Sequence, residues 1–359
     1  MRKLERHSKK IKIFCILLML ICYGITSAQK KPIGKEGIPT IVNFFEQKPI
    51  VAIGETHGHV QLYQFLTELV QIEGFYKNVN DILIESGNAL YQDTLDKYIS
   101  GGDVPYIDIQ KIWLNTTQSP VDAWNTDIYI KLLKAIRELN LRISKNDRIR
   151  VVAADSPIEW KNVRTNEDYL KERGNREEFY ASTVINEVLS KNRKALLING
   201  GAHFGNHRPT TVNQRIEKEF PNTVTVVLAS SGLWRGNEDK EEQLNWSPGT
   251  ITKVKDTWIG LLPGPRRITM SASSTTSTST TTPVIPDVGP PSKFKRQNYF
   301  DYLLYLGPSK DMTYGNIDNS IYQSEKLWKE FNRRSIIRFN HNLIKDSRKT
   351  GELRPEAYN

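Results

Sequence analysis

The sequence predicts an α/β protein with a mostly parallel central sheet flanked by helices on both faces. Short, continuously apolar runs indicate strands that are covered on both sides. Amphipathic segments of helical period separate these runs along the chain. Such an alternation of strands and helices is typical of a parallel sheet with crossover helices.

The predicted strands share a high content of Val, Ile and Leu and lack the polar alternation of a half-exposed sheet. They cover residues 49–54, 81–84, 149–154, 195–199 and 223–229. Three predicted helices lie between them, at 60–75, 127–141 and 168–192, and the first two carry a clear apolar stripe. The intervening stretch 91–124 is rich in aromatic residues, which fit either a lid over a ligand or ordinary core packing.

The two ends and one internal stretch differ in composition from this α/β part. Residues 1–28 combine a basic start, a short apolar run and small residues at 26–28, which predicts a cleaved secretory signal peptide and an exported protein. The apolar run is shorter than the roughly 20 residues that span a bilayer, so we expect no membrane span after cleavage. The main domain is expected over 29–270. Residues 271–292, rich in Ser, Thr and Pro, predict a disordered loop, 293–310 carry a closing strand of the same domain at 302–307, and 311–359 form a basic tail with a helix at 324–345.

Composition excludes several classes of function. Both cysteines, Cys15 and Cys22, lie in the predicted signal peptide, so the mature chain has no disulfide, cysteine nucleophile or thiolate metal site. The formal net charge of +10 comes from the signal peptide and the segment after residue 292, which leaves the main domain neutral. A neutral domain argues against nucleic-acid binding. The chain also lacks a G-x-S-x-G sequence, so a nucleophile-elbow hydrolase has no support.

Histidines gather in two short glycine-rich motifs. The chain has six histidines, and His7 lies in the predicted signal peptide. His57 and His59 follow the first predicted strand, and His203 and His207 follow the strand at 195–199. Clustering of this kind is not typical of isolated surface histidines, and it indicates a functional site.

Carboxylates follow the same pattern. Glu55 comes directly after the first strand, Glu85 after the second and Asp155 after the third. The carboxyl ends of strands in an open α/β sheet line the ligand crevice, so we expect these side chains and the histidines to face one small-molecule site. Charged groups at the ends of apolar strands are costly to bury without a purpose. His59, His207 and Asp155 are explained equally well as cap or turn residues.

Two chemistries fit this set of side chains. In the first, His57 is a general base that activates water, Glu55 or Glu85 orients its imidazole, and His203 serves as an acid or an oxyanion donor. In the second, Glu55, His57, Glu85 and His203 bind zinc, manganese or iron, which would lower the pKa of a bound water. The spacing does not match His-Glu-x-x-His, the sequence signature of many zinc hydrolases.

The motifs Gly54-Glu55-x-His57-Gly58, Glu85 and Gly200-x-x-His203 resemble those of the erythromycin esterase and ChaN-like clan, which includes the Tiki-type proteases. The resemblance extends over 50–307. It implies Glu55, His57, Glu85 and His203 as the shared catalytic residues, and a function that is metal-free hydrolysis, metal-dependent proteolysis or haem binding. The esterases carry an arginine in the helix after the first motif, where this chain has residues 60–67 without one.

We therefore expect an exported, hydrolase-like protein acting on an ester, lactone or amide. The alternative is a haem- or metal-binding envelope protein of the ChaN type without catalysis. His59, Asp155 and His207 are expected to contact the ligand, and the cofactor is left open as none, a divalent metal or haem.

Overall fold

The computed structural model of the chain describes residues 30–120, 124–206, 208–232, 238–264, 294–316, 318 and 323–344. Its centre is an eight-stranded mixed sheet in the order β1-β7-β8-β6-β2-β5-β3-β4. Six strands from β8 to β4 run parallel to one another, and β7 pairs antiparallel with both β8 and β1. The α/β class and the mostly parallel sheet are thus confirmed.

The strands are short, as expected for a sheet of continuously apolar runs. Their bounds are β1 Lys35–Glu36, β2 Ile50–Glu55, β3 Asp81–Asn88, β4 Arg150–Asp155, β5 Ala195–Gly200, β6 Val224–Ser230, β7 Thr250–Lys253 and β8 Tyr302–Tyr305. β8 is the last strand in the sequence, but it lies inside the sheet, between β7 and β6.

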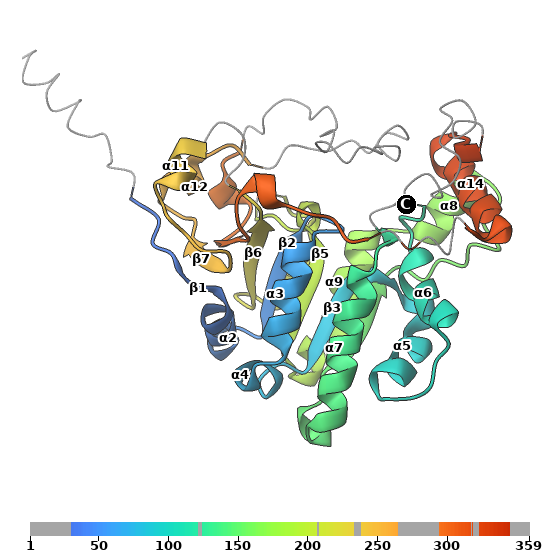
Figure 1. Cartoon of the computed structure of the whole chain (residues 1–359), viewed down its shortest axis with the longest axis horizontal. Helices are drawn as coiled ribbons and strands as arrows, with labels where there is room; N and C mark the ends of the chain where they lie inside the picture. The colour runs from blue at the N-terminus through green and yellow to red at the C-terminus, as the bar shows by residue number, and fades with distance from the viewer. Residues whose placement is uncertain are drawn as a thin grey trace, which may run out of the picture.

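Helices connect the parallel strands and pack on the sheet (Figure 1). The α-helices are α2 Gly37–Gln47, α3 Val60–Val70, α4 Glu73–Tyr76, α5 Gln92–Ile99, α6 Tyr106–Leu114, α7 Ile128–Arg142, α8 Asn166–Arg173, α9 Arg176–Glu187, α10 Val212–Glu219, α11 Glu238–Glu242, α12 Trp258–Leu261 and α14 Glu325–Phe339. Short 3-10 turns are η1 Ala89–Tyr91, η3 Lys145–Asp147, η4 Leu189–Lys191, η5 Gly201–His203, η7 Arg296–Asn298 and η8 Ser309–Asp311.

Neighbouring residues of each central strand enter two different apolar clusters. In β2, Val51 and Ile53 join a cluster with residues of α3 and α7, whereas Ile50 and Ala52 join one with residues of α9 and α10. This alternation follows from the two-residue period of a strand. Burial of both sets explains why the sequence of these strands is apolar throughout.

Three predicted elements differ from the structure. The predicted helix 168–192 is divided into α8 and α9, because Gly174 has a φ of +57°, a backbone conformation that glycine adopts most readily. Asn175 then caps α9 by accepting a hydrogen bond from the Glu178 amide. The predicted helix 60–75 is likewise divided, because Ile72 is extended between α3 and α4.

The third difference concerns β3, which continues past the predicted end at residue 84 to Asn88. Its register with β4 shifts between Ile84 and Asn88, so the strand is irregular where Glu85 lies. Glu85 and Asn88 in this added part are buried in hydrogen-bonded positions.

The predicted signal peptide at 1–28 and the predicted loop at 271–292 lie outside the described residues. Within the described part of the chain, no helix has both the length and the apolar character needed to cross a bilayer.

Candidate functional site

The candidate site lies at the carboxyl ends of β2, β5, β3 and β4, which are neighbours in the sheet. Glu55 ends β2, Asp155 ends β4, Glu85 lies in β3, and His203 ends the turn η5 that follows β5. Parallel strands bring their carboxyl ends to one edge. The structure thereby places these four residues and His57 in one region, as the sequence predicted.

The first unit of the site is a histidine–carboxylate pair. Nδ1 of His57 lies 3.0 Å from Oε1 of Glu55, whose side chain is 1% exposed. The imidazole also packs against the ring of Trp124, with 4.3 Å between ring centroids. A buried carboxylate on Nδ1 and an aromatic ring on one face fix the orientation of the imidazole. Its other nitrogen, Nε2, has no hydrogen-bond partner among the described residues.

Gly200 allows the His57 ring and Glu85 to lie close to each other. A Cβ at this position would lie 2.8 Å from Cε1 and 3.1 Å from Nε2 of His57, and 3.4 Å from Oε2 of Glu85. Any side chain at residue 200 would therefore collide with the His57 ring. The His57 ring, including Nε2, consequently lies close to Gly200.

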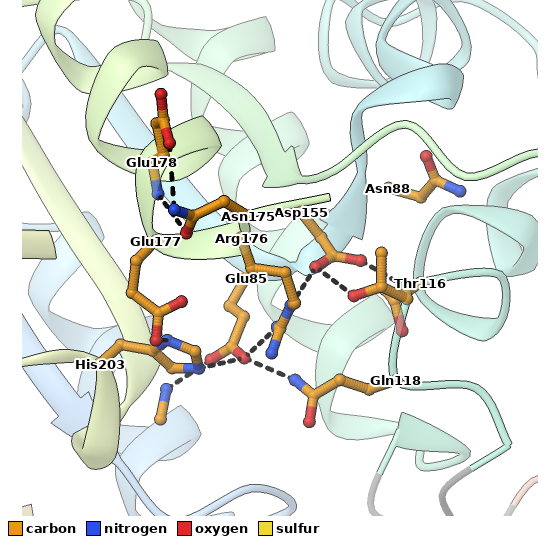
Figure 2. A network of polar contacts seen from close by, with 12 residues as sticks. Glu85, Asn88, Thr116, Gln118, Asp155, Asn175, Arg176, Glu177, Glu178 and His203 are labelled. Atoms are coloured by element: carbon orange, nitrogen blue, oxygen red, sulfur yellow. Dashed lines mark hydrogen bonds and ion pairs between the residues drawn. The ribbon is translucent and has the colours of Figure 1, made fainter. Parts of the chain in front are cut away.

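Glu85 is the centre of the second unit (Figure 2). Oε2 accepts a hydrogen bond from the Gly200 amide at 2.6 Å. Oε1 receives bonds from Arg176 at 2.6 Å and Gln118 at 2.5 Å, and lies 2.9 Å from Nε2 of His203. Four partners around a side chain that is 1% exposed hold this carboxylate as an anion in one orientation.

Asp155 extends the network through Arg176. Its Oδ1 accepts a hydrogen bond from Nε of Arg176 at 2.9 Å and one from Oγ1 of Thr117 at 2.7 Å. Its Oδ2 accepts the Thr117 amide at 2.5 Å. Arg176 therefore bridges Asp155 and Glu85, two carboxylates that would otherwise repel each other in a buried position.

His203 is held at both ring nitrogens. Nε2 faces Glu85, and Nδ1 lies 3.2 Å from Oε1 of Glu177. An imidazole that donates to two carboxylates must carry both protons and a positive charge. Desolvation opposes this charge, but the attraction of Glu85 and the hydrogen bond to Glu177 raise the pKa of His203 to about 9.

The two units also differ in their remaining pKa shifts. Burial raises the pKa of Glu55, and the pKa of His57 is raised, against desolvation, by Glu85 and by its bond with Glu55. The pair holds its proton more firmly than an isolated imidazole would. Burial alone would raise the pKa of Glu85, but His203, His57 and Arg176 keep it well below its usual range.

Of the other two histidines of the motifs, the structure describes His59. His59 is 1% exposed, precedes α3, and its Nε2 lies 2.9 Å from Oγ of Ser231. Burial lowers its pKa to about 4, so it is neutral. Among the described residues, its side chain bonds to Ser231 and not to His57, Glu85 or His203, and the ligand contact expected for it stays a prediction. His207 lies outside the described residues.

The aromatic stretch before α7 contributes one aromatic side chain to the site, beside Thr117 and Gln118. Trp124 packs on His57, and it also contacts Tyr129. Trp113 is buried in the core, and Tyr106 is half-exposed. The stretch contains α5 and α6, so core packing accounts for most of its aromatic residues.

Sequence reasoning missed the residues that complete the second unit: Arg176, Glu177, Gln118 and Thr117. The site residues were predicted from their place directly after a predicted strand, and none of these four residues has that place. The predicted helix 168–192 ran through Arg176 and Glu177, and only the Gly174-Asn175 pair marks the new helix start that points them toward the site.

The geometry does not fit a divalent metal ion held by Glu55, His57, Glu85 and His203. No group of three or more His, Cys, Asp or Glu side chains within the described ranges is placed to hold one. Arg176 supplies the positive charge between Glu85 and Asp155, where a cation would otherwise balance them. Both nitrogens of His203 are engaged by carboxylates, which leaves Nε2 of His57 as the ring nitrogen of the site available to a ligand.

No protein-family model and no curated protein matches the chain. Among solved structures, a Bacillus cereus protein is similar with 10% identity and a TM-score of 0.53, over 81% of this chain and 97% of that one. A succinoglycan biosynthesis protein matches with 10% identity, a TM-score of 0.54 and the same coverage. At these identities the likeness shows a shared fold.

ChaN of Campylobacter jejuni, a protein described with cofacially bound haem, is also similar. Its identity is 15%, its TM-score is 0.32, and the match covers 56% of this chain and 92% of ChaN.

Proposed function

We propose that this protein is an exported hydrolase that activates water at His57 to cleave an ester, lactone or amide bond. The observation that carries the proposal is the orientation of His57, with Nδ1 on the buried Glu55 and Nε2 unengaged above Gly200. This is the arrangement of a general base whose position and tautomer are set by a carboxylate.

In the proposed reaction, a water molecule attacks the carbonyl carbon of the substrate and gives its proton to Nε2 of His57. The proton on Nδ1 stays on the nitrogen, hydrogen-bonded to Glu55, which stabilises the imidazolium that forms. When the tetrahedral intermediate collapses, Nε2 returns the proton to the departing alkoxide or amine. Each turnover leaves His57 in its starting state.

The second unit supports this chemistry by charge and position. His203 and Arg176 are fixed cations close to the place where negative charge develops on the substrate oxygen, and their orientation is set before the reaction begins. A helix-covered sheet, as the two apolar clusters on either side of β2 suggest, provides the rigid support for the site. The site does not depend on a cysteine or a serine nucleophile.

The test combines spectroscopy with turnover. The purified chain is examined by elemental analysis and absorption spectroscopy, and then assayed on aryl esters, lactones and peptide amides with and without a chelator. We expect hydrolysis that the chelator does not change and that His57→Gln abolishes, while His59→Gln retains it. His59→Gln is the matched control because it removes a histidine two residues away that does not contact the site.

A Soret band or a stoichiometric metal that is lost in both His57→Ala and His203→Ala would instead support the haem- or metal-binding alternative. Absence of turnover on all three substrate classes, with no binding of the corresponding phosphonate analogues, would contradict the hydrolase.

A further inference from the structure

The loop after α6 carries two of the side chains that hold the site carboxylates. Thr117 donates its amide and its hydroxyl to Asp155, and Gln118 donates to Glu85. The loop follows α6, which ends at Leu114, and is far in sequence from both β3 and β4. Its conformation therefore decides whether these donors meet their carboxylates.

This loop is shaped by side chains rather than by a regular backbone ladder. Every backbone carbonyl from residue 114 to residue 119 accepts a hydrogen bond from a side chain. The donors are Arg334 to Leu114 at 3.1 Å, Asn88 and Trp160 to Asn115 at 2.7 and 3.2 Å, Trp160 to Thr116 at 3.1 Å, Tyr169 to Thr117 at 3.1 Å, and Arg338 to Gln118 and to Ser119, the latter at 2.9 Å.

Two of these donors come from α14, near the C-terminal end of the chain. Arg334 is 6% exposed, and it also donates to Oγ of Ser119 at 2.9 Å. Burial lowers the pKa of both Arg334 and Arg338, because the charged guanidinium loses contact with water. The hydrogen bonds to the loop carbonyls offset this cost of desolvation. In Figure 1, α14 lies beside α8, at the end of the sheet that is near α6.

The same arginines cover the aromatic side chains that hold the middle of the loop. The guanidinium of Arg334 lies 4.8 Å from the ring centre of Trp160, and that of Arg338 lies 5.3 Å from the ring centre of Tyr169. Trp160 and Tyr169 are stacked on each other at 5.8 Å. Together they form a small cluster with Ile158 and Val163, against which Ile337 of α14 packs.

We infer that α14 is a positioning element of the candidate site, with Arg334 and Arg338 as the positioning residues. They fix the 114–119 loop, the loop fixes Thr117 and Gln118, and these two hold Asp155 and Glu85. The basic character of the C-terminal segment is explained in part by this task, because arginine can serve several carbonyls at once. The inference rests on the proposed function in so far as it concerns activity, whereas the exchange experiment below does not require the protein to be a hydrolase.

The experiment compares Arg338→Met with Lys329→Met in the full chain. Lys329 lies on the same helix, is 67% exposed and pairs with Glu325 on the surface. The first readout is amide hydrogen exchange of Thr117, whose N–H is bonded to Asp155, relative to Leu197 in the core strand β5. Loss of a hydrogen bond to a charged group corresponds to about tenfold to 100-fold faster exchange.

We expect Arg338→Met to accelerate exchange at Thr117 by that amount while Leu197 is protected as in the wild type, and Lys329→Met to change neither. Acceleration of both amides in equal proportion would show that α14 contributes only to global stability, and would overturn the inference. Unchanged exchange at Thr117 would overturn it as well.

Two further variants keep the test decisive if Arg338→Met does not fold. Gln118→Met leaves α14 intact and removes only the donor to Glu85, so exchange at Thr117, which bonds to Asp155, should stay as in the wild type. Arg334→Met should reproduce the exchange result of Arg338→Met. A wild-type chain without hydrolase activity would contradict the proposed function and leave the exchange experiment fully informative.

Discussion

Two histidine–carboxylate pairs lie at the same edge of the sheet, and they differ in the partner of the second ring nitrogen. His57 has Glu55 on Nδ1 and no described partner on Nε2. His203 has a carboxylate on each nitrogen. In the proposed function, one combination of residue types gives a proton carrier in the first case and a fixed cation in the second, because the number of carboxylate partners decides whether a proton can leave.

The largest effect is expected for Arg176→Met, on the fixed-charge side of the comparison. It leaves Glu85 and Asp155 buried without their shared cation, and loss of one partner of a buried pair typically costs about 3–5 kcal/mol. Chemical denaturation measures the free energy of unfolding. Arg193→Met is the control, since it removes the partner of the buried Asp81 at the opposite end of β3. Both variants should lose stability by this principle, and a loss for Arg176→Met well below about 3 kcal/mol would show that the network does not hold the site.

On the proton-carrier side, His57→Gln is expected to lower kcat by a factor of about 10² to 10⁴, the usual contribution of a general base. The free energy of unfolding should also fall, because Nδ1 of His57 is the hydrogen-bond partner of the buried Glu55 and its ring packs on Trp124. Steady-state kinetics and denaturation are measured on the same preparation. Retained kcat would contradict the role assigned to His57.

Stability and activity should respond to pH in opposite directions. The folded pKa of His203 is about 9 against 6.5 for an ordinary histidine, so its stabilisation, about 3 kcal/mol, is complete below pH 6.5 and is lost as the pH rises through 9. Activity requires neutral His57 and should rise with pH, with a midpoint above 6.5. Denaturation and kcat/KM are measured at each pH from 5 to 10.

A variant of the pair itself sharpens this contrast. The pKa of His57 is raised by Glu85 and by Glu55, and Glu55→Gln removes the second of these carboxylates, so the midpoint of the activity profile should move to lower pH. The alkaline loss of stability should remain. A profile that falls with rising pH would make His57 an acid rather than a base.

The smallest effect is expected at His59, which lies outside the comparison. Ser231→Ala removes its hydrogen bond and should cost about 1 kcal/mol, with kcat unchanged. The folded pKa of His59 is about 4, below the ordinary 6.5. Its contribution is therefore present above pH 6.5 and is lost as the pH falls through 4, the reverse of His203. Acid denaturation of the wild type and of His59→Asn measures this difference.

The sequence predicted the parts of this molecule that depend on local pattern. The parallel strands followed from their apolar runs, and Glu55, His57, Glu85 and His203 followed from their place after those runs. The antiparallel β1 and β7 were not predicted, because each is four residues or fewer and leaves no periodic signal. Likewise, Arg176 acts from the start of a helix whose beginning depends on the backbone of Gly174.

The roles of the two histidines could not be separated from the sequence. Both follow a strand and both have a glutamate nearby in the fold. The difference arises from Glu177, which reaches Nδ1 of His203 from the start of α9. Gln118, which holds Glu85 from the loop after α6, depends on tertiary packing that includes α14, more than 200 residues further along the chain.

The central claim is that His57 exchanges a proton at Nε2 while His203 keeps both of its protons. Nitrogen-15 NMR of the histidine side chains between pH 5 and 10 tests it most directly. We predict that His203 is protonated at both nitrogens at pH 7 with a midpoint near 9, and that His57 titrates at Nε2 while Nδ1 keeps its proton. A His203 that is neutral at pH 7, or a His57 that loses its proton from Nδ1, would contradict the account.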